Sequence, residues 1–153
     1  MGQIATLVAL SAPLIPPAQN IPPLYAERMA GLVRRDLTGP FAIAGFGVFQ
    51  TRLPPGGLSG LRHSHSIREE FIYVLEGEGV LVRSDGEFSL AAGMAAGFVA
   101  GEVHQLINRS DCDFVYLDIT SSAPGDQVSF PDENLAFADA GVGGGRGFVP
   151  NTP

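Results

Sequence analysis

Two histidines and a carboxylate lie close together in the segment 62–77. In an extended strand the side chains alternate between two faces, so His63 and His65 are expected to point to the same side. Together with Glu70 they would supply part of the coordination shell of a divalent transition metal. A further ligand has to come from elsewhere, and His104 is the only other histidine in the sequence.

The carboxylate has two candidates, because Glu69 directly precedes Glu70. Alternation with the apolar Ile72 and Val74 favours Glu70 as the inward-facing residue and puts Glu69 outside or at the mouth of the strand. Each histidine taken singly also has an ordinary explanation, since strand histidines usually face solvent or are hydrogen-bonded in the core. The pair in register with a carboxylate favours a metal site.

The length and composition of the chain exclude several kinds of binding partner and of chemistry. The 153 residues suit one domain, and the net charge of −7 argues against nucleic acid or an anionic membrane surface as a partner. All nine basic residues are arginines, which excludes Schiff-base chemistry on lysine. Cys112 is the only cysteine, so no disulfide within the chain is expected. We identify no signal peptide or transmembrane segment and expect a cytoplasmic protein.

Short apolar runs separated by glycine and proline predict an all-β fold, a closed antiparallel sandwich or jelly roll with about eight strands. Residues 1–40 are expected to form a proline-rich N-terminal arm and a first strand, with residues 25–37 as either a short helix or an edge strand. The barrel core is expected in 41–120, with 41–53 buried on both faces and a hairpin across 84–86. Residues 121–153 are expected to be a loop-rich C-terminal tail packed on the barrel.

Two spaced groups of residues resemble the two motifs of the cupin superfamily. The matching residues are Gly57, His63, His65, Glu70 and Gly77 in the first motif, and Gly93, Gly101, His104 and Asn108 in the second. Val99 departs from the second motif, which usually has a proline there, but that position shapes a turn rather than contacting the metal. The resemblance covers residues 41–120, and five segments are most similar to a small single-domain bacterial group often described as sugar-phosphate isomerases: 46–48, 53–56, 70–77, 108–111 and 125–128.

The resemblance implies a double-stranded β-helix barrel, usually dimeric, with His63, His65, Glu70 and His104 as metal ligands. Such a set suits Fe, Mn, Ni or Zn and leaves two positions of an octahedral shell open for water, substrate or O₂. A closed structural zinc site would prefer thiolates. Cys112 does not offer one, because the carboxylates on both sides of it raise the pKa of its thiol.

The chemistry beyond the metal is less defined by the sequence. Arg52, Tyr73, Phe49 and Phe98 are the candidate substrate contacts, although the first two could equally be outer-face residues and the aromatics ordinary core. With three histidines as ligands, a general base would have to be a carboxylate, a tyrosine or hydroxide on the metal.

Three functions remain open at this point. The first is a metal-dependent enzyme, either a dioxygenase or an isomerase, lyase or decarboxylase. The second is a non-catalytic cupin that binds or senses a small molecule, and the third is a structural barrel. The expected partners are a small-molecule ligand and a second copy of the chain in a homodimer, for which the apolar arm and strand faces argue.

Overall fold

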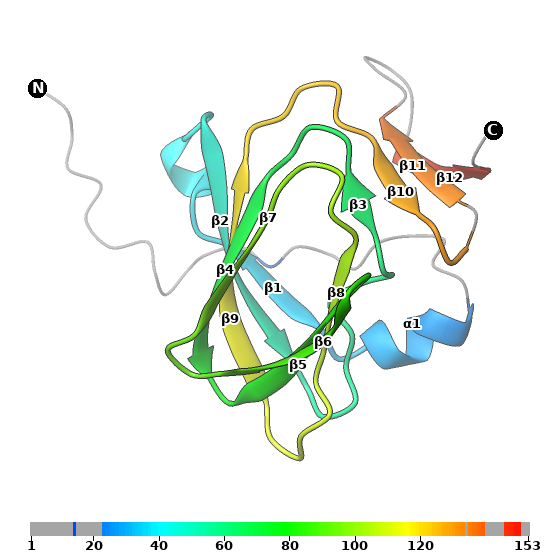
Figure 1. Cartoon of the computed structure of the whole chain (residues 1–153). Helices are drawn as coiled ribbons and strands as arrows, with labels where there is room; N and C mark the ends of the chain where they lie inside the picture. The colour runs from blue at the N-terminus through cyan, green and yellow to red at the C-terminus, as the bar shows by residue number, and fades with distance from the viewer. Residues whose placement is uncertain (1–13, 15–22, 134, 140–145, 151–153) are drawn as a thin grey trace, which may run out of the picture.

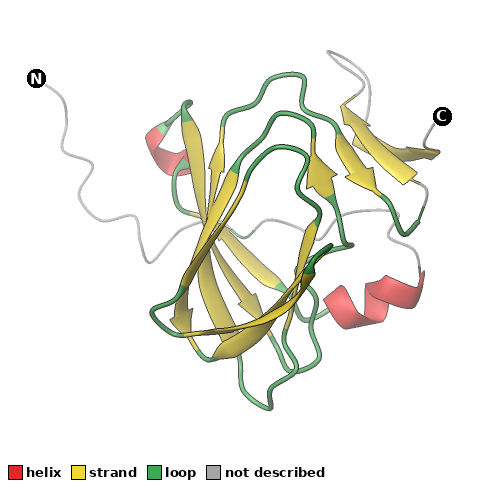
Figure 2. Cartoon of the chain, in the orientation of Figure 1, coloured by secondary structure: helices red, strands yellow, loops and turns green. Residues whose placement is uncertain are grey.

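The structure is a computed structural model that describes residues 14, 23–133, 135–139 and 146–150. Its strands form a five-stranded sheet in the order β1-β2-β9-β4-β7, a three-stranded sheet β6-β5-β8 and a four-stranded sheet β12-β11-β10-β3 (Figures 1 and 2). The elements in chain order are α1 (Pro23–Met29), β1 (Val33–Asp36), a 3₁₀ turn (Gly39–Phe41), β2 (Phe46–Leu53), β3 (Ser64–His65), β4 (Glu70–Glu76), β5 (Glu78–Arg83), β6 (Gly86–Ala91), β7 (Ala95–Phe98), β8 (His104–Ile107), β9 (Phe114–Ser121), β10 (Val128–Phe130), β11 (Leu135–Asp139) and β12 (Arg146–Pro150).

The hydrophobic core lies between the five-stranded and the three-stranded sheet. Alternate residues of β4 point inward, so Ile72 and Val74 are buried while Phe71 and Tyr73 are exposed. The strand pairs in the described residues are antiparallel. Such a sheet can bury one face and leave the other more open, and the inner faces of these two sheets pack on each other. The buried cluster consists of Leu53, Ile72, Val74, Leu81, Leu90, Phe98, Leu106, Phe114 and Tyr116.

The predicted all-β antiparallel barrel is confirmed, including the hairpin at 84–86, which joins β5 and β6. The segment 25–37 contains both of the alternatives considered, because α1 ends at Met29 and β1 begins at Val33. The tail is not only loop: β10, β11 and β12 lie within it, and β10 pairs with β3. The N-terminal arm lies outside the described residues except for Leu14, which forms a bridge to Arg35.

The expectation that residues 41–53 form one strand buried on both faces is wrong. A 3₁₀ turn covers Gly39–Phe41, Ala42 has a positive φ of 54°, and β2 begins only at Phe46. Phe41, Ile43 and Phe46 are exposed. The turn explains the difference, because it interrupts the alternation before the inward-facing run of β2 begins.

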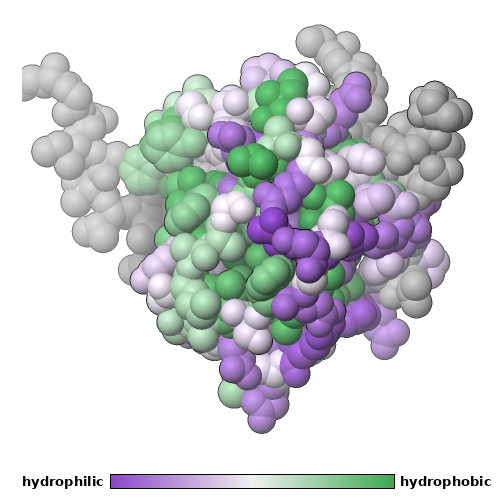
Figure 3. All heavy atoms as spheres, in the orientation of Figure 1, coloured by the Kyte–Doolittle hydropathy of each residue, from purple (hydrophilic) through white to green (hydrophobic). Residues whose placement is uncertain are grey.

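The outer face of β4 carries exposed apolar side chains, namely Phe71, Tyr73 and Leu75. Figure 3 shows hydrophobic residues gathered on the side of the molecule that carries β4 and β7, with hydrophilic residues more frequent on the opposite side of the view. Within the described part of the chain, no helix has the length and apolar character that crossing a membrane would require.

Candidate metal centre

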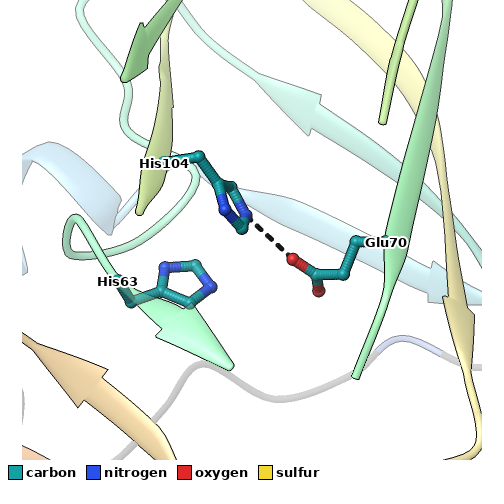
Figure 4. A group of neighbouring side chains, drawn as sticks. All are labelled: His63, Glu70 and His104. Carbon is teal, nitrogen blue, oxygen red and sulfur yellow. Dashed lines mark ion pairs between the residues drawn. The ribbon is translucent and has the colours of Figure 1, made fainter. Parts of the chain in front are cut away.

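His63, Glu70 and His104 converge at one end of the barrel. Each offers one ligand atom, and these atoms lie within 4.8 Å of one another. Figure 4 shows the three side chains pointing toward a common space, with a dashed line for the ion pair between His104 and Glu70. Nε2 of His104 lies 2.8 Å from Oε2 of Glu70. The backbone brings them together because His63 forms a β-bridge with His104, while Glu70 opens β4.

His65 completes this group from β3. Its Nε2 atom lies 3.5 Å from Oε1 of Glu70, and its ring centroid is 5.1 Å from that of His63. Of the four side chains that the sequence singles out as ligands, His63, Glu70 and His104 form the close group, and His65 adjoins it through its contact with Glu70. Glu69 is exposed, whereas the side chain of Glu70 is only 12% exposed, so the carboxylate inside the barrel is that of Glu70.

The Nδ1 atom of each histidine has a partner that can only accept a hydrogen bond. His63 donates to the carbonyl oxygen of Leu61 at 2.7 Å, and His104 donates to that of Glu102 at 3.0 Å. His65 donates to the carboxylate of Asp126 at 2.5 Å. A neutral ring that keeps its proton on Nδ1 has the lone pair on Nε2 free for a metal, which would replace the contacts that Nε2 of His65 and His104 make with Glu70. Such outer hydrogen bonds on Nδ1 fix both the tautomer and the orientation of metal-binding histidines.

Burial and neighbouring charges together set the pKa values of His63, His65 and Glu70. Burial lowers the pKa of His63 to about 4, with a further contribution from His104, so this ring is neutral near pH 7. Burial disfavours the charged form of His65, but Glu70 and Asp126 outweigh it and raise the pKa of this ring. Burial also opposes ionisation of Glu70, yet hydrogen bonds from His104 and His65 hold the pKa of its carboxyl far below the ordinary range.

This donor set fits a divalent transition metal. It offers neutral imidazole nitrogen atoms and one ionised carboxylate, which are the ligands of Fe, Mn, Ni and Zn sites, and no thiolate is present among them. A bound metal would act as a Lewis acid or redox centre toward a ligand in its open positions. His63, His65, Glu70 and His104 would hold it, and Asp126 would orient His65.

The four expected substrate contacts divide into two groups. Phe98 is buried, and its ring stacks on His104 with centroids 3.9 Å apart and an angle of 5°. Phe49 shares the inward face of β2 with Thr51 and lies beside Arg34 rather than beside a ligand histidine, with the Arg34 guanidinium 4.1 Å from its ring centroid.

Arg52 and Tyr73 do not reach the centre. Arg52 alternates with the buried Thr51 and Leu53 and forms an exterior ion pair with Asp113 at 2.8 Å. Tyr73 lies on the outer face of β4 and is exposed. Their chemical type suggests a substrate contact, but the strand alternation that turns Glu70 inward turns Arg52 and Tyr73 outward.

Two carboxylates near the centre were missed by sequence reasoning. Asp126 binds His65 from the tail, and its only sequence signal is the Gly-Asp-x-Val segment at 125–128. Asp118 points inward from β9, where it forms an ion pair with Arg34 at 2.5 Å. Alternation with the buried Tyr116 and Thr120 could have revealed Asp118 as an inward-facing charge in an apolar strand.

Comparison with known proteins identifies the family of this barrel. The sequence profile of the cupin domain matches residues 49–120. A solved sugar phosphate isomerase from the cupin superfamily of Silicibacter pomeroyi DSS-3 is 31% identical, with 92% of this chain and 88% of that chain covered and a TM-score of 0.82. No curated protein matches.

Two further solved structures extend the comparison. One, from Acidithiobacillus ferrooxidans ATCC 23270, is described as a candidate sugar phosphate isomerase; it is 26% identical, covers 77% of this chain and 76% of its own, and has a TM-score of 0.69. KdgF from Halomonas sp. is 17% identical with a TM-score of 0.55, covering 61% of this chain and 81% of its own, and shows the fold alone.

Proposed function

This chain belongs to the cupin superfamily, and we propose that it binds one divalent transition metal (Fe, Mn, Ni or Zn) through His63, His65, Glu70 and His104. At this centre it acts on or binds a small organic molecule. The open coordination positions that such a ligand set leaves are where that molecule would bind.

One observation carries this proposal. Three histidines turn their Nε2 atoms inward because each Nδ1–H is held by an acceptor, and Glu70 lies among them with its carboxylate within 4.8 Å of the His63 and His104 ligand atoms. Histidines in an ordinary core need no such uniform orientation toward a carboxylate. This orientation supports a preorganised metal site with hydrogen bonds that hold its ligands in place.

The second candidate function is an isomerase-like reaction on a sugar phosphate. It is favoured by the Silicibacter pomeroyi structure, which is described as a sugar phosphate isomerase and aligns with 92% of this chain at 31% identity. An isomerase needs a group that moves a proton. Asp118 is a carboxylate inside the barrel and would be the candidate, since the histidines are engaged at the metal.

Metal analysis tests the proposal. Elemental mass spectrometry of the purified chain is expected to find one transition metal per chain, and chelator treatment followed by titration is expected to restore it. A chain that takes up no transition metal under these conditions would contradict the proposal.

Turnover assays then separate the alternatives. Oxygen uptake with 1,2-diketones, catechols or thiols would indicate a dioxygenase, and conversion of a sugar phosphate followed by NMR would indicate the isomerase. Binding of a small molecule without turnover would indicate a sensing or binding cupin.

A further inference from the structure

Arg34 and Asp118 form an ion pair that faces the inside of the barrel. Asp118 lies opposite Phe49 of β2 and opposite the buried Ile72 of β4. Arg34 lies on the edge strand β1, opposite the buried Thr51, and its side chain reaches Asp118 with an Nη2–Oδ2 distance of 2.5 Å. The side chain of Arg34 is 32% exposed and that of Asp118 is 16% exposed. The arginine therefore lies between the solvent and the less exposed carboxylate.

This pair is next to the candidate metal centre. Glu70 is opposite Thr120, two residues after Asp118 on β9. Two residues of a strand span about 7 Å, and their side chains share a face. Burial is the largest influence on the pKa of the Asp118 carboxyl and raises it, Arg34 lowers it, and the charges of Glu70 and His104 also act on it, Glu70 raising and His104 lowering the pKa. Asp118 therefore lies one layer of side chains from the metal ligands, toward the apolar core.

The position of the Arg34 guanidinium is fixed by two contacts. Asp118 binds it from one side, and the ring of Phe49 lies 4.1 Å from it. Gly47 makes room for that ring, because a Cβ at position 47 would come within 2.7 Å of Phe49. The Nε atom of Arg34 is buried and has no hydrogen-bond partner. A buried donor without an acceptor is costly, and an acceptor on a ligand would satisfy it.

We propose that Arg34 is the anion-binding residue of this cupin: its guanidinium binds a carboxylate or phosphate group of the small molecule at the metal centre, and Asp118 competes with that group for it. This inference rests on the proposed function, because it concerns the ligand of the same site. The substrate class that follows is a small organic anion.

The chemistry of arginine supports that class. Its planar set of donors matches the oxygen atoms of carboxylates and phosphates, and it remains charged at any physiological pH. The chain as a whole carries a net charge of −7, which repels anions at a distance. A cation inside the barrel, close to the metal ligands, would add to the charge of the bound metal in attracting an anion there.

The test compares binding of two probes, inorganic phosphate and malonate, to the metal-loaded protein by isothermal titration calorimetry. Arg34→Gln removes the proposed binding group, and Asp118→Asn removes its competitor. Arg52→Gln is the matched control, since Arg52 forms an ion pair of the same type with Asp113 at 2.8 Å on the outside of the barrel. Metal affinity is measured for every variant in a separate titration, so failure of the metal site is distinguished from failure of this inference.

We expect the wild-type protein and Arg52→Gln to bind at least one probe alike, and Arg34→Gln to bind it at least about tenfold more weakly. Asp118→Asn is expected to bind it more tightly, whereas a purely structural ion pair predicts no gain in this variant. The probe that binds better distinguishes a carboxylate from a phosphate. Equal binding by Arg34→Gln and wild type, equal loss in Arg52→Gln, or no binding of either probe by the wild type would overturn the inference.

Discussion

His65 and Asp126 are joined by a hydrogen bond of 2.5 Å between Nδ1 and Oδ2, although they are 61 residues apart in the chain. The other oxygen atom of Asp126 accepts hydrogen bonds from the backbone N–H groups of Ile67 and Arg68, at 2.8 and 3.1 Å. One carboxylate of the tail thus holds both the ring of His65 and the loop that leads from β3 to β4.

Replacement of Asp126 should therefore weaken metal binding without removing a ligand. In Asp126→Asn the charge is lost and the amide can turn its NH₂ group toward Nδ1, which would favour the wrong tautomer of His65. We expect a loss of about 10–100-fold in metal affinity, measured by competition with a chromogenic chelator. Asp132→Asn is the control, because Asp132 pairs with Arg62 on the surface; unchanged affinity in Asp126→Asn would contradict the assigned role.

The adjacent residues Glu69 and Glu70 allow a test of which carboxylate binds the metal. Glu70→Gln is expected to abolish stoichiometric metal binding, because the amide is a much weaker ligand for a divalent metal and lacks the charge. Glu69→Gln is expected to keep one metal per chain, since Glu69 is exposed. Elemental analysis of both purified variants, with circular dichroism as a check of folding, decides the matter. Equal metal loss in the two variants would refute the assignment.

Asp118 should make stability depend on pH. Burial raises the pKa of its carboxyl from 3.8 to about 6, while Arg34 opposes and Glu70 adds to the shift. The folded chain thus holds this proton more tightly than the unfolded chain, and the stabilisation that results is complete below about pH 4 and is lost as the pH rises through about 6.

Between pH 4 and 7, the free energy of unfolding of the wild type should fall relative to that of Asp118→Asn by an amount on the order of 3 kcal/mol. Urea denaturation at four pH values in this interval measures the difference. Asp113→Asn, which changes the exposed ion pair with Arg52, is the matched variant. A constant difference between wild type and Asp118→Asn would show that Asp118 does not titrate there.

Gly77 and Gly93 both have a positive φ, but only at Gly77 would an added Cβ also collide with a neighbouring atom. Comparing the two separates the cost of backbone strain from the cost of a steric clash. Gly77 (φ 73°) closes the turn between β4 and β5, where an added Cβ would collide with the carbonyl oxygen of Asp113. Gly93 (φ 88°) has no atom within 4 Å of such a Cβ. Gly93→Ala should cost about 1 kcal/mol of unfolding free energy, and Gly77→Ala about 3 kcal/mol or more, since a clash adds to the backbone strain. Equal midpoints in thermal denaturation would contradict this assignment.

The homodimer stays a prediction. The exposed apolar side chains of β4, Phe71, Tyr73 and Leu75, form the surface that we expect a second copy of the chain to cover. Sedimentation velocity should give the mass of a dimer for the wild type and of a monomer for the double variant Phe71→Asp/Tyr73→Asp. Arg109→Asp changes an exposed residue that pairs with Glu87 of β6, in the three-stranded sheet, and should leave the dimer intact. A monomeric wild type would refute the prediction.

The sequence was sufficient for the features that depend on local alternation. Glu70, Ile72 and Val74 share an inward face, and the hairpin at 84–86 follows from its Asp-Gly turn. In the segment 41–53 alternation alone was misleading, because the positive φ of Ala42 breaks the register and no glycine marks the position.

Features that depend on distant pairing could not be found in this way. Arg34 and Asp118 are 84 residues apart and meet only because β1 and β9 both pair with β2. Asp126 likewise meets His65, 61 residues away, only because β10 pairs with β3. Sequence spacing gives the type of each group, but the register of non-neighbouring strands decides which groups meet.

The short pairing of β10 with β3 places Val128 of the tail opposite His65. Opening of this pairing is therefore expected to affect the rate at which a bound metal leaves the candidate centre. Transient separation of these two strands would carry Asp126 away from His65 and expose the amide of Ser66, which donates to the carbonyl of Gln127. Amide hydrogen exchange at Ser66 and dissociation of the metal would then share one local unfolding event and slow down together when the pairing is strengthened.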